Sequence, residues 1–460
     1  MAEDQITEDL HEEDDYALDR ETVEPVLTAL REGDSDALIE ALEPVHPADI
    51  ADLLEQVDED TRLRLVQLYG KEFDGDILSE LNESVRESVI GALHPEVLAD
   101  AVRELETDDV VDLIEDLDEP QQEIILDALA VTDRAAVEQS LSYPEESAGR
   151  LMQRELVAAP EHWDVGHLID HMRAHDDLPD QFYHVILVDP RMRPTGYVTL
   201  GKIMASPRTT ALSEITEDSF RTIPVYQDEG DVAYAFNQYH LISAPVVDED
   251  DRLVGVITID DAMIILDEEH EEDILRLAGV GDGSLNDRVS ETVRARLPWL
   301  AVNLGTAILA SLVIALFEDV IAGFVALAVL MPIVASMGGN AGTQSLTVAV
   351  RAIATRDLTS SNVWRVIRRE AAVGFINGAV FAVVMGIVGV IWFGTPLLGA
   401  VIAAAMVINL MVAGLAGVLV PVLLDKFKID PALASGTFVT TVTDVVGFFA
   451  FLGLAGIVLL

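Results

Sequence analysis

The chain has 460 residues, a formal net charge of −53 and no cysteine. Lack of cysteine excludes disulfides, thiolate metal sites and a cysteine nucleophile, and the negative charge excludes nucleic acid as a partner. The charge is uneven, because residues 297–460 contain seven acids and seven bases and the whole excess therefore lies in residues 1–296. Lysine occurs at only four positions. An acid-rich, lysine-poor surface is typical of a halophilic protein, since molar salt shortens the screening length to roughly 3 Å.

The N-terminal part predicts an acidic leader followed by a helical domain. Residues 1–20 lack the apolar content of a packed core, so we expect them to be disordered, and they do not resemble a signal peptide. In residues 21–143 apolar side chains recur at helical spacing, for example at Ile50, Leu53, Leu54 and Val57. The segments HPADIADLLEQV and HPEVLADAVREL both open with His-Pro. This similarity suggests related helical units stacked into an α-solenoid-like superhelix.

Residues 144–205 and 206–266 have a different pattern, in which β-branched runs, acidic turns and short helices alternate. The segments GYVTLGKI and GVITIDDA align with each other and end two βαβ units. This duplicated pattern resembles a tandem pair of CBS domains. In such pairs the positions of Thr258 and Asp261 can hold a nucleotide ribose, so the resemblance makes ATP a candidate ligand. Lys202 stands in the first copy where Asp261 stands in the second, which leaves at most one such site; alternatively, Asp261 caps a helix or binds a metal.

Residues 267–296 connect this α/β part to the apolar half and begin with a dense acidic helix. Five acids fall within the six residues 268–273. Like charges at this spacing destabilise a helix unless cations neutralise them. The candidate cation ligands are Glu269, Glu272 and Asp273, and simple adaptation to salt is the alternative explanation.

Five apolar segments follow, and each exceeds the roughly 20 residues that a helix needs to cross a bilayer. They are Leu297–Phe317, Val320–Val350, Val363–Phe393, Leu397–Leu424 and Pro431–Leu460. All seven bases of residues 297–460 flank the second and fourth connections, and the first and third contain none. By the positive-inside rule, the N-terminal domains are cytoplasmic and the C-terminus is external. We therefore expect a multi-domain membrane protein with a helical N domain, an α/β CBS pair, an acidic connecting helix and a five-helix all-α transmembrane domain, residues 297–460.

Two polar motifs interrupt these apolar segments, MGGNAGTQS (Met337–Ser345) and TTVTDVVGF (Thr440–Phe448). Asp444 is costly at membrane depth, so it should face a partner, an ion or a water-filled path. The Gly-Gly-Asn-Ala-Gly run is expected to break its helix and expose backbone carbonyls, which is tolerated only inside protein or along a cavity. Together the motifs predict a cation pathway. The alternative is that Asp444 only hydrogen-bonds to neighbouring threonines as a packing contact.

These motifs closely resemble those of the MgtE family of magnesium channels, and the resemblance covers nearly the whole chain after the leader. Its residues are Pro332, Gly338-Gly339-Asn340, Gln344, Asp430-Pro431-Ala432 and Thr441 through Asp444 to Gly447. The resemblance implies a homodimer in the cell membrane whose pore is lined by the second and fifth membrane helices, with Asp444 of both subunits binding Mg²⁺. It also implies Mg²⁺ sensing by the acidic domains. The candidate metal ligands are Asp444, Thr440, Asn340, Asp430, Glu269, Glu272, Asp273, Asp261 and Asp248.

The chemistry of Mg²⁺ agrees with this interpretation, because the ion dehydrates reluctantly and one or two carboxylates suffice to hold it. We expect a channel or transporter for Mg²⁺ uptake, closed by cytosolic Mg²⁺, and not an enzyme. A Na⁺- or H⁺-coupled divalent-cation carrier is the alternative, because a channel and a carrier can share a binding aspartate. Asp430 beside Pro431 is either an ordinary helix N-cap or a ligand at the pore mouth.

Overall fold

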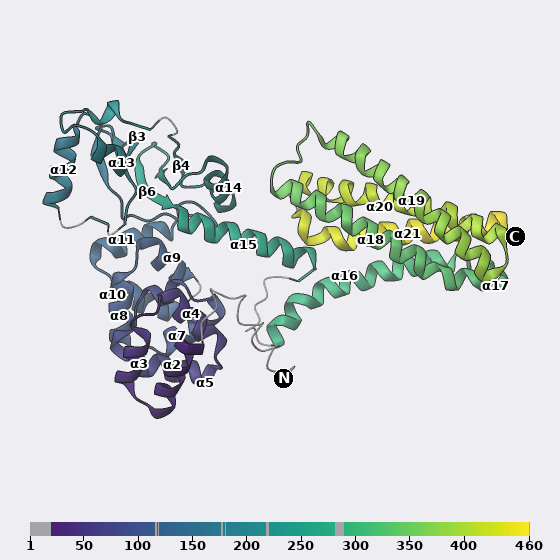
Figure 1. Ribbon diagram of the computed structural model, residues 1–460, viewed down its shortest axis with the longest axis horizontal. Helices are drawn as coiled ribbons and strands as arrows, with labels where there is room; N and C mark the ends of the chain where they lie inside the picture. Colours follow the sequence, from purple (N-terminus) through teal and green to yellow (C-terminus); the bar gives the residue numbers. More distant parts are fainter. Residues whose placement is uncertain are drawn as a thin grey trace, which may run out of the picture. The chain divides into compact units, whose positions relative to one another are not determined.

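The computed structural model describes residues 20–459 except 116, 118, 176–177, 180, 218–219 and 281–288. The chain divides into two compact units, Met1–Glu268 and Glu269–Leu460, and each is described by itself. Figure 1 shows the elements of both units. The predicted acidic leader, residues 1–20, lies outside the described residues except for Arg20.

The first unit begins with a domain of short helices, which confirms the predicted helical N domain. The helices are α2 (Arg20–Glu32), α3 (Ser35–Leu42), α4 (Pro47–Gln56), α5 (Glu59–Tyr69), α6 (Asp76–Ser79), α7 (Glu83–Ala92), α8 (Pro95–Glu104), α9 (Thr107–Glu115), α10 (Glu119–Ala128) and α11 (Val131–Ser140), with a 3₁₀ turn at Gly70–Glu72. Their apolar faces share one core around Leu54, Leu65 and Ile77. Short amphipathic helices of this kind are stable only because they pack on one another.

The two His-Pro segments adopt the same local structure. The imidazole Nδ1 of His46 accepts a hydrogen bond from the backbone N–H of Ala48 at 3.2 Å, and that of His94 accepts one from Glu96 at 3.4 Å. The prolines that follow occupy the first turns of α4 and α8, where a missing N–H costs nothing. The repeated His-Pro therefore marks two equivalent helix starts.

The rest of the first unit contains two small sheets of identical topology, which confirms the CBS pair. In the first, β1 (Ala158–Pro160) pairs parallel with β2 (His184–Val188), which pairs antiparallel with β3 (Pro194–Thr199). The second repeats this with β4 (Ile223–Pro224), β5 (Ser243–Val247) and β6 (Leu253–Thr258). The helices are α12 (Val165–Ala174), α13 (Leu200–Ala205), α14 (Glu229–Tyr239) and α15 (Ile259–Leu277), with a 3₁₀ turn at Leu212–Glu214.

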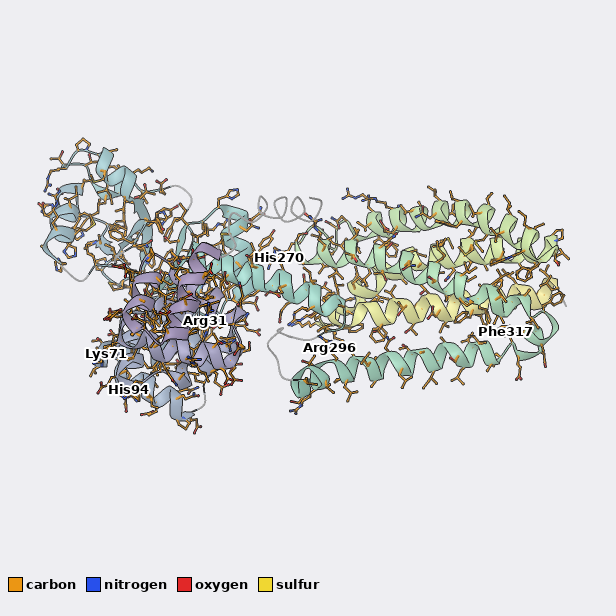
Figure 2. The ribbon with its side chains drawn as sticks, turned by 60° about the horizontal axis from the view of Figure 1, so that its bottom comes forward. Arg31, Lys71, His94, His270, Arg296 and Phe317 are labelled. Atoms are coloured by element: carbon orange, nitrogen blue, oxygen red, sulfur yellow. The ribbon has the colours of Figure 1, made fainter. Side chains whose placement is uncertain are left out.

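The second unit is a helical bundle in which the described residues include five helices long and apolar enough to cross a membrane. Its elements are the end of α15, then α16 (Val289–Ala315), the short α17 (Glu318–Gly323), α18 (Ala326–Ala354), α19 (Val363–Phe393), α20 (Pro396–Lys426) and α21 (Pro431–Val458). Figure 2 shows Arg296 near the beginning of α16 and Phe317 just beyond its end, at opposite ends of the bundle. The five predicted membrane segments are thus confirmed.

Small residues let the helices of the bundle approach closely, with α20 in contact with α18, α19 and α21. A Cβ on Gly414 would lie 2.7 Å from the Glu370 carbonyl oxygen of α19, and one on Gly417 would lie 2.7 Å from the Gly342 carbonyl oxygen of α18. Such contacts replace the hydrophobic effect, which does not drive helices together in lipid.

The structure contradicts one expectation about the first polar motif. Helix α18 continues without a break from Ala326 to Ala354 and includes Gly338, Gly339 and Asn340, so the predicted helix break with exposed carbonyls is wrong. An unbroken helix satisfies its own backbone hydrogen bonds, which a membrane environment strongly favours. The glycines serve close packing instead, because Gly338 lies against Asn409 and Gly342 against Val439.

Candidate ion path and carboxylate cluster

One face of α18 is polar and exposed although the helix is otherwise apolar. Its polar side chains recur every three or four residues and so lie along one side of the helix. We call this side the α18 polar face: Ser336, Asn340, Thr343, Gln344 and Thr347. The Thr343 hydroxyl donates to the Gly339 carbonyl at 3.0 Å, which reduces the polarity of that side chain. Asn340 donates only a long bond of 3.5 Å to the Ser336 hydroxyl. Exposed amides at membrane depth are costly against lipid and suit water or a polar partner.

Asp444 lies half-buried on α21, and its carboxylate has no hydrogen bond or ion pair with any residue that the structure describes. The neighbouring threonines are occupied elsewhere. Thr440 donates to the Gly436 carbonyl at 3.0 Å, Thr441 to the Thr437 carbonyl at 2.6 Å and Thr443 to the Thr440 carbonyl at 2.9 Å. The alternative in which these hydroxyls hold Asp444 as a packing contact is therefore wrong.

The packing of α18 on α21 fixes the depth of Asp444. A Cβ on Gly342 would lie 2.6 Å from Val439 Cγ1 and 3.5 Å from Thr443 Cγ2. Farther along, Gly338 of α18 and Gly447 of α21 both lie against the Asn409 side chain. Thr443 precedes Asp444 on α21 and Gly447 follows it. Asp444 therefore lies at the depth of the Gly338–Gly342 segment of α18, which contains Asn340.

Asn409 is a residue of this region that the sequence reasoning missed. Its side chain is 0% exposed in the middle of α20, and its Nδ2 donates to the Val334 carbonyl of α18 at 2.8 Å. Its Oδ1 is buried and accepts no hydrogen bond from the described residues. An amide within the apolar run of residues 397–424 was the available signal, because a buried polar group there needs a specific partner.

The end of α15 lies at the base of α18 and α21 within the second unit. Leu277 packs against the apolar cluster that contains Leu346 and Val439, and its carbonyl oxygen would lie 3.6 Å from a Cβ on Gly436. The end of α15 therefore packs closely against the C-terminal half of α18 and the N-terminal part of α21, the two helices that carry the polar motifs.

Charged residues surround the same helix end. Arg276 Nη2 pairs with Glu272 Oε1 at 2.5 Å, and its Nη1 lies 3.1 Å from Asp430 Oδ2. Burial, and then the charge of Asp430, raises the pKa of Asp273. The Oδ1 of Asp430 accepts from the Ala432 N–H at 2.7 Å, so Asp430 is the N-cap of α21. Three candidate ligands thus gather around one arginine, whereas Glu269 is exposed one turn earlier on α15.

A second group of acids lies inside the first unit, where the start of α9 meets the start of α15. We call it the carboxylate cluster: Glu106, Asp108, Asp109, Glu155, Asp260 and Asp261. Burial, then the charges of Glu155 and Asp261, raises the pKa of Glu106 to about 7. Burial and then Asp261 raises that of Asp109 to about 7. The acids disfavour one another's ionised forms, so the cluster favours protons or cations.

Hydrogen bonds fix several of these carboxylates in place. Gln153 Nε2 donates to Glu106 Oε2 at 2.6 Å, and Thr107 Oγ1 donates to Glu155 Oε1 at 2.7 Å. Thr258 Oγ1 donates to Asp261 Oδ2 at 2.7 Å. Burial raises the pKa of Asp261 to about 6 even though the Thr258 bond lowers it. The predicted pair of Thr258 and Asp261 is therefore in contact, but it faces the carboxylate cluster.

The first CBS copy replaces this carboxylate with an internal ion pair. Lys202 Nζ lies 3.1 Å from Glu217 Oε2, and the Lys202 N–H donates to Thr199 Oγ1 at 3.4 Å. A cation therefore stands where the second copy has Asp261. This agrees with at most one equivalent site in the pair.

Asp248, another predicted metal ligand, belongs to neither of these acidic groups. Asp248 Oδ1 accepts from the backbone N–H groups of Asp250 and Arg252 at 2.9 and 2.8 Å, so it stabilises the turn between β5 and β6. Across the described ranges, no group of three or more His, Asp or Glu side chains is arranged to hold a metal. The sequence reasoning did not single out Glu106, Asp108 or Asp109, although the adjacent aspartates of TDDVVD and TIDDA were a visible signal.

A helical domain, a CBS pair and a bundle of five membrane-length helices define a multi-pass membrane transport protein with CBS domains. More narrowly, the chain belongs to the MgtE family. Residues 331–454 match the family's divalent cation transporter domain, residues 45–146 its intracellular N domain, and residues 148–208 and 212–268 match CBS domains.

Relatives resemble the chain over most of its length. The magnesium transporter MgtE of Thermus thermophilus is 32% identical over 438 residues, which cover 94% of this chain and 97% of that protein. The magnesium transporter MgtE of Bacillus subtilis is 28% identical over 431 residues, covering 94% and 96%. A crystal structure of the cytosolic domain of the Mg²⁺ channel MgtE in complex with ATP is 30% identical with a TM-score of 0.50, covering 53% of this chain and 99% of that chain.

Proposed function

We propose that this protein transports Mg²⁺ across the cell membrane as a homodimer, through a path lined by α18 and α21. The observation that carries the proposal is the Asp444 carboxylate, which lies at the depth of Asn340 and has no partner among the described residues. The α18 polar face is exposed on a single subunit. If a second copy faced it across water, neither the Asp444 carboxylate nor the polar side chains of α18 would be exposed to lipid. The full-length relatives named as magnesium transporters support the choice of ion.

The residues fit a hydrated Mg²⁺ ion better than a dehydrated one. Mg²⁺ keeps several waters and takes one or two carboxylates, so two Asp444 residues, one from each subunit, suffice. Asn340 supplies an amide at that depth. The Thr440 carbonyl accepts the Thr443 hydroxyl and, inside α21, the backbone N–H one turn further on, so the Thr440 atom left to accept a water of the ion is its hydroxyl oxygen. No preformed cage of three protein ligands is required.

We further propose that cytosolic Mg²⁺ closes this path by binding the acidic domains. Without cations, the acids within the carboxylate cluster repel one another, and the acids around Arg276 do the same among themselves. Divalent ions that bind these groups favour the compact arrangement and shift the population towards the closed state. The ligands in this proposal are Glu269, Glu272, Asp273, Asp430 and Asp261, with Asp248 as a further surface site.

Two other features of the proposal come from the domain arrangement. The CBS pair binds ATP at one site per subunit, through Thr258 and Asp261, in analogy with the ATP complex of the similar cytosolic domain. The N-terminal domains face the cytoplasm and the C-terminus faces outside, because the bases of residues 297–460 flank only the second and fourth connections. The surface is adapted to high salt.

Mg²⁺ uptake into proteoliposomes tests the transport proposal. Asp444→Asn keeps the size of the side chain but loses the charge that offsets ion dehydration, so uptake should fall at least about tenfold while folding persists. Asp425→Asn neutralises an exposed acid in the last turn of α20; it is the matched control and should transport normally. Full uptake by Asp444→Asn would refute the assignment.

The same vesicles separate a channel from a coupled carrier, which remains the second candidate function. An aspartate that binds the transported ion is compatible with both. Uptake that follows only the Mg²⁺ gradient supports the channel. Uptake that requires an imposed Na⁺ or H⁺ gradient would identify the carrier instead.

A further inference from the structure

A cavity of about 170 Å³ lies between the end of α18, residues 355–362 and the start of α19. Its apolar lining residues include Val348, Ala352 and Val418. Its charged lining residues are Arg365 and Arg369, together with Asp357 and Glu370. The cavity lining is therefore amphipathic, because it combines apolar side chains with charged ones.

The segment that supplies the charged lining has the opposite charge to the rest of the chain. Residues 351–370 contain five arginines against Asp357 and Glu370, a net charge of +3 in a chain of −53. Both acids are engaged locally, since Glu370 accepts from the Ser345 hydroxyl at 2.9 Å and Asp357 from the Thr355 hydroxyl at 3.1 Å. Among the residues that the structure describes, no carboxylate pairs with Arg365 or Arg369.

The start of α19 adds positive potential at the same place. The first turn of α19 contains no acid, and Asn362 at the N-cap makes no side-chain capping bond. Its side chain instead accepts from the Thr359 N–H at 2.9 Å and donates to the Asp357 carbonyl at 2.7 Å. Arginines near a helix N-terminus oppose the helix dipole. An anion bound at this position would be attracted by both the arginines and the helix dipole, and so would offset their mutual repulsion.

The surroundings indicate an anion with an apolar tail. Trp364, between the cap and Arg365, is 67% exposed, and Val348 is 58% exposed. Exposed tryptophan beside arginine is typical of the membrane–water interface, where basic pockets between helices bind lipid head groups. A free phosphate would contact the arginines but would leave the apolar lining residues unused.

We propose that this cavity binds the phosphate head group of an anionic phospholipid. Arg365 and Arg369 hold the phosphate oxygens, since the planar guanidinium donates two parallel hydrogen bonds, and an acyl chain runs along the Val348 side. The positive-inside rule requires only charge near a membrane end. A cavity with unpaired arginines goes beyond that requirement, and the proposal does not depend on what the protein transports.

Lipid retention by the purified full-length protein tests the site. In native mass spectrometry with phosphatidylglycerol and phosphatidylcholine of equal chain length, we expect the wild type to retain phosphatidylglycerol at least about fivefold better. Arg365→Gln with Arg369→Gln should abolish that preference. Lys426→Gln with Lys428→Gln removes two charges from the fourth connection and should leave the preference unchanged.

A conservative pair keeps the test independent of folding and topology. Arg365→Lys with Arg369→Lys preserves every charge but loses bidentate recognition, so most of the preference should disappear while the thermal melt stays unchanged. If this pair kept the full preference for phosphatidylglycerol, bidentate recognition by the two arginines would be excluded, and nonspecific charge attraction would explain the result. Displacement of phosphatidylglycerol by an equal concentration of inorganic phosphate would overturn the lipid assignment in favour of free phosphate.

Discussion

The side-chain amide of Asn409 donates a hydrogen bond of 2.8 Å to the backbone carbonyl of Val334 and so joins α20 to α18 inside the bundle. The same side chain lies against Gly338 of α18 and Gly447 of α21. Asp444 precedes Gly447 by one helical turn. One buried amide therefore sets the spacing of the two helices that carry the candidate ion path.

Gly338→Ala should destabilise this contact. An ideal Cβ at this position would overlap the Asn409 side-chain nitrogen, so the amide must move and its bond to Val334 weakens. Overpacking of this kind costs about 1–3 kcal/mol, and the melting temperature in detergent should fall by several degrees. Gly339→Ala is the control, because nothing lies within 4 Å of its Cβ position. Equal melting temperatures for the two variants would contradict the packing role of Gly338.

The carboxylate cluster should make the stability of the first unit depend on pH. Folding raises the pKa of Glu106 and Asp109 to about 7 and that of Asp261 to about 6. The folded state therefore binds these protons more tightly than the unfolded state, and its stability is lost as pH rises through the folded pKa values. In a chelator-containing buffer, the melting temperature should fall between about pH 5 and about pH 8.

Mg²⁺ should reverse this loss, because a divalent ion replaces the protons that leave the cluster. We expect the rise in melting temperature on adding Mg²⁺ to be larger at about pH 8 than at about pH 5. A constant rise across this range would show that Mg²⁺ acts elsewhere on the surface.

Neutral variants locate this effect in the cluster. Glu106→Gln with Asp109→Asn removes two mutually repelling charges, so the protein should be more stable without Mg²⁺ and should gain less from it. Asp52→Asn with Glu87→Gln removes two exposed acids of the same helical domain and controls for net charge. Thermal melts at low salt with a Mg²⁺ titration measure both pairs. An identical response from the two pairs would assign the repulsion to total charge.

Much of the fold could be predicted from the sequence because the relevant signals are local. Apolar runs longer than a bilayer crossing predicted five spans, and the duplicated strand pattern around Val198 and Ile257 predicted the CBS pair. The difference between the two copies was also visible, since Lys202 stands where Asp261 stands in the second copy, and in the structure it pairs with Glu217.

The errors and omissions concern residues whose role depends on a distant partner. Glycine in an apolar run can break a helix or admit a neighbour, and only the position of Asn409 shows that Gly338 does the second. Asn409 itself gave no pattern, because its partner Val334 is a backbone group on another helix. The same holds for Glu106 and Asp261, which are far apart in sequence and come together only when the helical domain packs on the CBS pair.

The acidic first unit should fold only when cations are abundant. Residues 1–296 carry the whole net charge of −53, and a similar cytosolic domain has been crystallised separately from its membrane part. We expect a fragment of residues 1–275 to lose helical circular dichroism in dilute buffer and to regain it in molar KCl, which screens charges beyond roughly 3 Å. Millimolar Mg²⁺ should be as effective as molar KCl, because it binds at specific carboxylates as well as screening. Glu106→Gln with Asp109→Asn, which removes two mutually repelling charges, should lower the KCl concentration needed and reduce the advantage of Mg²⁺ over KCl. A fragment that is fully folded in dilute buffer and indifferent to Mg²⁺ would refute this account.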